Sequence, residues 1–378
     1  MKLQENIPLA PLTTLGVGGQ ARYYLEAPDR LDVISAAQFA KNEKLPLLVL
    51  GSGSNLVVAD AGFEGVVVKI GPGGFSVTYP DSDPGKGAIT VAVGGADGGC
   101  PMIRAVPYRV GRTDCVIRAE AGESWDDIVE TALRYNAAGI ECLSGIPGTV
   151  GATPVQNVGA YGQEVAETIE EIDVLDRTVM DVRTLKNAEC GFGYRSSRFN
   201  TTDRDLYIIL SVTFRLRWNG EPNLRYADLQ RVFGARARPS LQQVREAVLQ
   251  IRRSKSMVLD PDDENRRSAG SFFKNPVVPV KVFEQLDDRL RSRGLAMPSY
   301  PAAEDMRKLS AAWLVEQAGF YKGYSSGAAG ISTRHSLAIV NRGGATAAEI
   351  VALKNEIQTR VMSEFGIELT PEPVFVGF

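Results

Sequence analysis

The sequence predicts a layered α+β protein, and three observations favour this class. Short runs rich in β-branched residues dominate the first two thirds of the chain, isolated amphipathic helices interrupt them, and longer helical segments follow from about residue 240. The chain has 378 residues, which exceeds what one hydrophobic core usually organises. We therefore expect two or three domains.

Six runs are expected to form strands, because each is a short apolar segment bounded by Gly, Asp or Pro. In chain order they are "LPLLVLG" (45–51), "GVVVKI" (65–70), "ITVAVG" (89–94), "CVIRAEAG" (115–122), "TIEEIDVLD" (168–176) and "LYIILSVTFRLR" (206–217). The segment "GPGGFSVTYPDSDPGKGA" (71–88) is rich in Gly, Pro, Asp and Ser, which predicts a loop or a hairpin connection.

The strand-rich part contains one clear helix signal. Ser124 is a candidate N-cap, Asp127 follows three residues later, and Gly139 suits the C-terminal turn of such a helix. Apolar residues between them fall on one face, as expected for a helix that covers a sheet.

Two later helices have stronger signals. Ser240 with Gln243 opens one of them, and Thr346 with Glu349 opens another that Gly366 ends. Each carries an apolar stripe at helical spacing. A second type of domain is therefore expected to begin near residue 240.

Composition argues against several classes of function. The chain carries 42 basic and 45 acidic residues, with a net charge of -3, so it has no general attraction for nucleic acid or for an anionic membrane. The four cysteines are far apart and there is a single histidine, His335, which argues against a zinc site, any other metal site and a disulfide framework. The N-terminus lacks a signal-peptide pattern and no window approaches 18 apolar residues, so we expect a soluble, cytoplasmic protein.

His335 lies in "STRHSLAIVN", at the start of an apolar, strand-like run. Partly buried imidazoles are usually satisfied by local hydrogen bonds, so a structural role is expected for it. General acid chemistry is then expected to fall to another side chain.

Two glycine-rich stretches could approach a ligand closely. "LVLGSGSNLVVAD" (48–60) follows an apolar strand with two glycines and two serines, whose N–H and hydroxyl groups can cradle a phosphate. "LSGIPGTVGATPVQNVGAYGQEV" (143–165) is glycine-rich and short in side chains over a length that a linker does not need. An ordinary strand-end turn and an Ω-loop are the respective alternatives.

Three polar residues stand out as candidates for chemistry. Arg195, in "CGFGYRSSRF" (190–199), offers a planar fork for a carboxylate, and Glu372 is held between two prolines in "LTPEPVFVG" (369–377). Ser271 lies before two phenylalanines in "SAGSFFKNP" (268–276), where a hydroxyl needs a polar partner. A surface arginine and an exposed glutamate are the alternatives for the first two.

Taken together, in this order and at these spacings, these five stretches closely resemble the UDP-N-acetylenolpyruvoylglucosamine reductase (MurB) family, flavoenzymes that complete UDP-N-acetylmuramate for bacterial peptidoglycan. The resemblance runs from "PLTTLGVGG" (11–19) to "PEPVFVGF" at the end of the chain. It implies an FAD-binding fold of the vanillyl-alcohol-oxidase type in two subdomains, 1–70 and 71–235 joined by 366–378, and a substrate-binding domain over 236–365. One departure is the segment 96–114, which is longer than the hairpin expected there.

The resemblance also implies a reaction. NADPH reduces a non-covalently bound FAD and leaves, and the enolpyruvyl ether of UDP-N-acetylglucosamine then takes its place. Hydride passes from flavin N5 to C3 of the ether, and C2 is left with negative charge that spreads into the carboxylate. In this scheme Arg195 and Glu372 polarise the carboxylate, and Ser271 is the general acid that protonates C2. Glu372 is expected to be protonated or to share a proton, because it meets a like charge.

Binding residues follow from the same resemblance. Those expected to bind the cofactor lie in the two glycine-rich stretches and are Gly51, Ser52, Gly53, Ser54, Asn55, Ile146, Pro147, Gly148, Gly151, Gln156, Asn157 and Gly159. Tyr226, Lys255 and Asn275 are expected to bind the substrate, and Lys255 could also help a transient serine alkoxide. Read without the resemblance, Arg252, Arg253 and Lys255 form a solvated helix end, and this interpretation is kept for Arg253. The expected partners are small molecules, with no nucleic acid and no membrane.

Two other functions are compatible with parts of the sequence. An FAD-dependent oxidase of the same fold often tethers its flavin to a histidine or cysteine in the nucleotide-binding half, whereas the one histidine here comes late in the chain. A catalytically silent flavin-binding or scaffold protein would keep "GSGSN" and lose the catalytic residues. Ser271, Arg195 and Glu372 are all present, which favours the reductase.

Overall fold

The structure is a computed structural model that describes residues 2–81, 87–94, 110–234 and 238–378. It divides into two compact units: the first comprises residues 1–7, 21–52 and 64–258, and the second comprises 8–20, 53–63 and 259–378. The three-part domain division expected from the sequence has different bounds and stays a prediction. Most of the unusual segment 96–114 lies outside the described residues.

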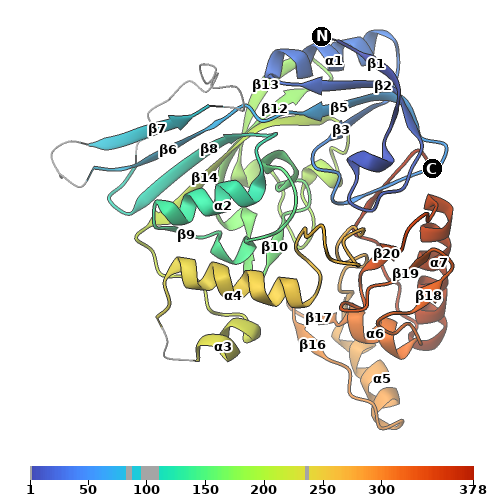
Figure 1. Cartoon of the computed structure of the whole chain (residues 1–378). Helices are drawn as coiled ribbons and strands as arrows, with labels where there is room; N and C mark the ends of the chain where they lie inside the picture. Colours follow the sequence, from blue (N-terminus) through green and yellow to red (C-terminus); the bar gives the residue numbers. More distant parts are fainter. Residues whose placement is uncertain (1, 82–86, 95–109, 235–237) are drawn as a thin grey trace. The chain divides into compact units, whose positions relative to one another are not determined.

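A small sheet and one helix form one layer of the first unit (Figure 1). Its strands are β1 (Gln4–Pro8), β2 (Gln20–Ala27), β5 (Phe63–Ile70) and β3 (Leu47–Leu50), in that spatial order, with β3 and β5 parallel. Helix α1 (Arg30–Asn42) begins at Asp29, whose side chain accepts a hydrogen bond from the N–H of Asp32. Its residues Val33 and Ala36 are buried against this sheet in a shared apolar core with Val66.

A larger antiparallel sheet forms the centre of the first unit. Its strand order is β13 (Asp181–Lys186), β12 (Ile169–Asp176), β14 (Tyr207–Trp218), β8 (Asp114–Glu120), β6 (Phe75–Pro80) and β7 (Ala88–Val93), and β9 (Ala137–Ala138) also pairs with β14. Helix α2 (Trp125–Arg134) packs on this sheet, with the rings of Trp125 and Phe214 5.5 Å apart (Figure 1). All six strands expected from the sequence are present, and segment 71–88 contains β6, the first strand of a hairpin with β7.

The ends of α2 differ from the expectation. Ser124 is the N-cap residue, but its side chain makes no capping hydrogen bond. The helix ends at Arg134, and Asn136, with φ of 51°, reverses the chain before Gly139 is reached. Asn is the side chain that best tolerates this left-handed conformation, because it can hydrogen-bond locally.

The rest of the described part of the first unit comprises further helices, a short strand pair and 3-10 turns. These are α3 (Ala227–Phe233), α4 (Leu241–Ser254), β10 (Gly159–Ala160) and β11 (Gln163–Glu164), with 3-10 turns at Glu141–Leu143, Val150–Ala152, Val165–Glu167, Asn187–Glu189 and Arg198–Asn200. The capping box of Ser240 and Gln243 at the start of α4 is confirmed. Helix α4 thus belongs to the first unit, although the sequence pattern changes there from short strands to longer helices.

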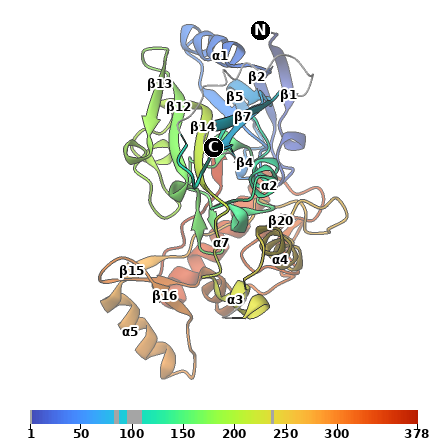
Figure 2. The ribbon, with the colours of Figure 1, turned by 90° about the vertical axis from the view of Figure 1, so that its left-hand side faces the viewer.

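The second unit has its own core around helix α7 (Ala347–Phe365). The capping box of Thr346 and Glu349 is confirmed, Gly366 ends the helix in the left-handed conformation, and the apolar stripe of α7 is buried. The other helices are Ala10–Leu12 (a 3-10 turn), α5 (Val280–Arg291) and α6 (Ala311–Gln317). Figure 2 shows α5 beside β15 and β16.

The strands of the second unit form three small sheets. They are β15 (Val277–Pro279), β17 (Met306–Leu309) and β16 (Ser299–Pro301); β18 (Ser325–Ser326), β19 (Ala329–Ile331) and β20 (Ile339–Asn341); and the parallel pair β21 (Val374–Val376) with β4 (Leu56–Val58). The expected α+β class is confirmed. Among the described helices, none has the length and apolar character needed to span a bilayer.

Candidate functional site

The segment 268–276 places Ser271 and Glu372 in one neighbourhood of the second unit. The N–H of Phe272 donates to the carbonyl of Leu337 at 2.7 Å, and the carbonyl of Phe272 accepts from the N–H of Glu372 at 2.9 Å. Phe272 and Phe273 are buried in the core of this unit. The two aromatic side chains therefore anchor the segment, and this leaves Ser271 half-buried beside them.

His335 lies against the candidate general acid. The Oγ of Ser271 and the Nε2 of His335 are 3.2 Å apart, and both residues are half-buried. The imidazole is placed by a turn in which the Oγ of Ser332 accepts the N–H of His335 at 3.3 Å. The sequence favoured a structural role for His335, and only its being the sole histidine marked it out.

Two other predicted residues lie in the second unit. The Nδ2 of Asn55 donates to the carbonyl of Glu372 at 3.3 Å, and the carbonyl of Asn55 accepts from the N–H of Val374 at 2.9 Å. The loop at residue 55 is thus tied to the segment that carries Glu372. The Oδ1 of Asn275 accepts a hydrogen bond from the N–H of Ala311 at 3.0 Å, at the start of α6. This oxygen is therefore already used inside the protein.

Arg195 lies in a tight turn of the first unit. Gly193 and Ser196 exchange backbone hydrogen bonds of 2.9 and 3.2 Å across this turn. Arg195 has φ of 53°, which is uncommon for a residue other than glycine and costs free energy. Its Nη2 donates to the carbonyl of Gly159 at 2.7 Å, so the guanidinium contacts the second glycine-rich stretch. The turn and this contact therefore hold Arg195 in a conformation that it would otherwise rarely adopt.

The glycines of both stretches are required by close contacts. A Cβ on Gly51 would lie 2.6 Å from the Oγ1 of Thr149, and a Cβ on Gly151 would lie 2.6 Å from that of Ala121. Gly53 has φ of 67°, and a Cβ there would lie 2.1 Å from a backbone oxygen. These backbones can therefore pass at distances that no other residue permits.

Most of the other predicted cofactor residues are half-buried, namely Ser54, Ile146, Pro147, Gly148 and Gln156, while Ser52 is exposed and Gly159 is buried. Asn157 is buried, and its side chain is used inside the protein. Its Nδ2 donates to Glu164 at 2.7 Å and its Oδ1 accepts from the N–H of Ala166 at 3.1 Å. Asn157 thus shapes the stretch and has little capacity left for a ligand.

Glu141 is a residue that the sequence did not point to. It is fully buried, and its carboxylate accepts hydrogen bonds from the N–H of Gly139 at 2.7 Å, the Nε2 of Gln163 at 2.8 Å and the N–H of Asn223 at 2.8 Å. A buried carboxylate is tolerated when its oxygens are satisfied in this way. Through Gln163, this carboxylate holds one end of the glycine-rich stretch 143–165 in place.

Tyr226 and Lys255 are brought together by α3 and α4. Tyr226 is the N-cap residue of α3 with 43% of its surface exposed, and Lys255 ends α4 with its Nζ 3.3 Å from the Oδ2 of Asp228 on α3. The ring of Tyr161 meets that of Tyr226 edge to face at 5.3 Å. Burial raises the pKa of Tyr161 to about 12, so its phenol stays neutral and can donate a hydrogen bond.

Arg252 differs from the expected solvated helix end, whereas Arg253 is exposed as expected. The Nη2 of Arg252 donates to the carbonyl of Met257 at 2.6 Å, but its Nε is buried and has no hydrogen-bond partner among the described residues. Burial also lowers the pKa of this guanidinium. A buried donor without an acceptor costs free energy, so this nitrogen is an unfavourable feature that the rest of the fold has to offset.

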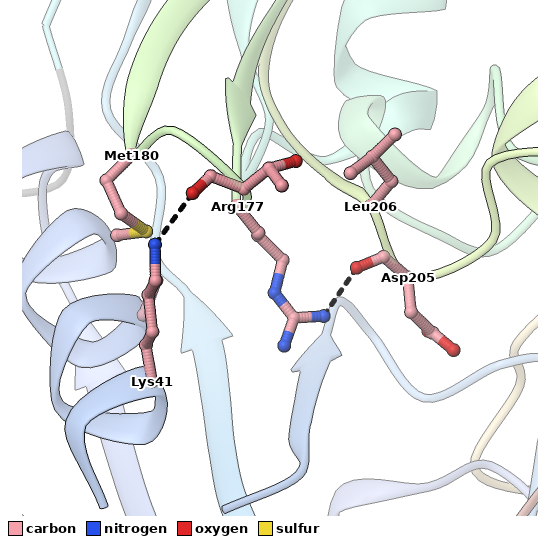
Figure 3. A pocket seen from close by; sticks show the side chains of 7 residues that line it. Lys41, Arg177, Met180, Asp205 and Leu206 are labelled. Carbon is pink, nitrogen blue, oxygen red and sulfur yellow. Dashed lines mark hydrogen bonds between the residues drawn. The ribbon is translucent and has the colours of Figure 1, made fainter. Parts of the chain in front are cut away.

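A surface pocket of about 470 Å³ lies elsewhere in the first unit (Figure 3). Lys41 and Arg177 line it, together with Met180 and Leu206. The Nζ of Lys41 already donates to a backbone carbonyl at 2.7 Å, and the Nη1 of Arg177 donates to the carbonyl of Asp205 at 2.6 Å. Both cations hold turns, and none of the predicted site residues lines this pocket.

Comparisons with known proteins agree with the resemblance. Residues 260–376 match the model of the UDP-N-acetylenolpyruvoylglucosamine reductase C-terminal domain, and residues 109–180 match an FAD binding domain. A UDP-N-acetylenolpyruvoylglucosamine reductase of Thermobifida fusca is 42% identical over 99% of this chain and 98% of that protein. One of Mycolicibacterium smegmatis is 41% identical over 100% of this chain and 96% of that protein.

A solved structure of the reductase from Thermus caldophilus covers 100% of this chain and 99% of its own, with a TM-score of 0.61 and 24% identity. This likeness supports the fold over the full length of the chain.

Proposed function

The chain belongs to the UDP-N-acetylenolpyruvoylglucosamine reductase family, and from this premise we propose that it reduces the enolpyruvyl ether of UDP-N-acetylglucosamine to UDP-N-acetylmuramate, for peptidoglycan synthesis, with NADPH as the hydride donor. It is an FAD-dependent oxidoreductase that acts on small molecules. The observation that best supports the reaction is the placement of Ser271: a half-buried hydroxyl, fixed by two buried phenylalanines, on a segment bonded to the backbone of Glu372.

The residues present fit FAD. Gly51 and Gly151 leave no room for a Cβ, and this is the kind of backbone that can lie against an extended cofactor. When bound, FAD would supply the hydride that the enolpyruvyl group receives.

The chain's own residues then have to stabilise the negative charge on the substrate and deliver one proton to it. We propose that the hydroxyl of Ser271 donates this proton to C2 of the substrate. A serine hydroxyl is a weak acid, but the carbanion at C2 is a stronger base than the alkoxide, so the transfer is favourable. Arg195 offers its planar fork to the substrate carboxylate, where developing charge is stabilised, and Glu372 acts on the same group. Tyr226, Lys255 and Asn275 are proposed to bind the nucleotide part.

The test separates the two half-reactions of the holoenzyme. Acid precipitation should first release the flavin into solution, as expected for a non-covalent cofactor. In Ser271→Ala, flavin reduction by NADPH should match that of the wild type. Reoxidation of the flavin by the enolpyruvyl substrate should fall by roughly 10² to 10⁴, the contribution of a positioned general acid. Rapid-mixing absorbance at the flavin band measures each step.

Ser268→Ala is the matched control, because it removes a hydroxyl from the same segment. It should leave both half-reactions close to those of the wild type. A Ser271→Ala variant that reoxidises at the wild-type rate would show that the proton comes from another group.

A further inference from the structure

His335 makes a contact that the proposed reaction leaves unexplained. Its Nε2 lies 3.2 Å from the Oγ of Ser271, and the two residues are 64 positions apart in the chain. The contact is held from both sides, because the N–H of Phe272 donates to the carbonyl of Leu337 at 2.7 Å and so joins the serine segment to the histidine turn. The two segments that carry these side chains are therefore held next to each other by the backbone.

The environment of the other ring nitrogen fixes which atom carries the proton. The backbone N–H of Leu337 points at the Nδ1 of His335, with 3.4 Å between the nitrogens. An amide N–H can only donate, so Nδ1 must present its lone pair. In the neutral imidazole the single proton is then on Nε2, and Nε2 donates to the Oγ of Ser271.

The direction of this hydrogen bond is opposite to the one that activates a serine nucleophile. In such a site the histidine accepts the serine proton at Nε2 and donates from Nδ1 to a carboxylate. Here the group at Nδ1 is itself a donor, so His335 cannot hold the serine proton in this tautomer. The hydroxyl oxygen of Ser271 accepts from His335, and its own hydrogen is left free to point elsewhere.

We propose that His335 is a positioning residue for Ser271: its Nε2–H orients the hydroxyl so that the serine hydrogen is directed to C2 of the substrate, and it then stabilises the alkoxide. This inference rests on the proposed function. In the step itself, the carbanion at C2 uses its electron pair to form the C–H bond, the O–H bond of Ser271 breaks, and the oxygen keeps that pair. The alkoxide is held by the Nε2–H bond until a proton from water restores the hydroxyl.

A donor aimed at a developing alkoxide is worth more than one aimed at a neutral hydroxyl, since charge-assisted hydrogen bonds are the stronger kind. Loss of His335 should therefore slow proton delivery and leave the earlier, flavin-reducing step alone. His335→Gln is the conservative variant, because its side-chain amide can donate from a nitrogen near the position of Nε2. His335→Ala removes the donor.

The experiment uses the FAD-loaded enzyme in rapid-mixing absorbance, with flavin content and circular dichroism as checks on folding. In His335→Ala, reduction by NADPH should be unchanged and reoxidation by the enolpyruvyl substrate should fall roughly 10- to 100-fold. The solvent deuterium isotope effect on reoxidation should rise, and added imidazole should restore part of the rate. His335→Gln should stay within a few-fold of the wild type. Arg334→Ala is the matched control, because it changes the exposed neighbour of His335. At saturating substrate it should leave both half-reactions close to those of the wild type.

Wild-type reoxidation in His335→Ala would overturn the inference. So would an equal loss in the Gln and Ala variants with an unchanged isotope effect and no response to imidazole, since a purely structural role gives that result. Ser271→Ala separates this failure from that of the proposed function. A slow Ser271→Ala with a normal His335→Ala removes only the role of His335, whereas a wild type that is not reoxidised by the enolpyruvyl substrate removes the function itself.

Discussion

The change Asp126→Asn tests how helices α2 and α4 are held together. Asp126 lies in the first turn of α2, and its two carboxylate oxygens accept from the Nη1 and Nη2 of Arg245 on α4, at 2.7 and 2.8 Å. It also accepts the N–H of Gly145 at 2.6 Å, in the second glycine-rich stretch. One carboxylate thus fixes both α4, which ends at Lys255, and the stretch assigned to the cofactor.

The expected cost follows from the burial of this pair. The side chains of Arg245 and Asp126 are 10% and 33% exposed, so the guanidinium would lose its nearer charge partner in a place with little water and keep only the more distant Glu130, at 3.8 Å. Removal of one member of a buried pair costs about 3–5 kcal/mol, and the new amide oxygen can still accept one bond. We therefore expect a loss of about 2–3 kcal/mol. Since about 2–4 °C of melting temperature corresponds to 1 kcal/mol in a unit of this size, the shift should be roughly 5–10 °C.

Thermal unfolding followed by circular dichroism measures the shift. Asp205→Asn is the control, because Asp205 is paired with Arg204 at 3.8 Å on the surface, where its side chain is 76% exposed. Exposed pairs of this kind contribute at most about 1 kcal/mol. Equal shifts in the two variants would refute the assignment of a stabilising role to the buried pair.

The same pair predicts a pH dependence with a definite sign. Burial alone would raise the pKa of Asp126, but the hydrogen bonds from Arg245 and Gly145 outweigh it, so the pKa lies below its ordinary value. A carboxyl group with a lowered pKa in the folded state stabilises that state above its unfolded pKa, and this contribution is lost as the pH falls through the folded one. The difference between wild type and Asp126→Asn should therefore be constant near neutral pH and shrink below about pH 4.

Two further predictions concern the candidate site. Arg195→Lys should lose nearly as much reoxidation rate as Arg195→Ala, because a point charge cannot reproduce a planar fork; full activity of the lysine variant in the rapid-mixing assay would remove Arg195 from the site. Gly151→Ala should lower the FAD content of the purified protein, because its Cβ would lie 2.6 Å from that of Ala121, whereas Gly111→Ala meets only the flexible side chain of Asp114 at 3.3 Å and should keep full flavin absorbance.

The sequence by itself determined the features that depend on neighbours in the chain. The capping boxes at Ser240 and Thr346 form as expected, since a capping side chain bonds to an amide only three residues away. The strand-forming runs are likewise local, because alternation and β-branching act within a few residues. The segment of Ser271 also stands out by itself, because a hydroxyl lies before two phenylalanines, whereas its role as general acid comes from the family resemblance and stays a proposal.

Where local signals were weak, the helix and its N-cap residue were predicted correctly and the details of its two ends were wrong. The helix after Ser124 lacks the side-chain cap and ends at Arg134, earlier than the glycine that was expected to end it. A cap of this kind contributes about 1 kcal/mol, which packing of Trp125 and its neighbours on the sheet can replace.

The tertiary structure decided the features that need partners distant in the chain. The contact of His335 with Ser271, the burial of the Nε of Arg252 and the three donors around Glu141 all join segments that no short-range pattern connects. The left-handed backbone of Arg195 is of the same kind, because its strain is tolerated only where the surrounding contacts hold it. The sequence therefore determined which reactive groups are available, whereas folding determined which of them are desolvated and paired, since burial and long-range hydrogen bonds exist only once the chain has closed on itself.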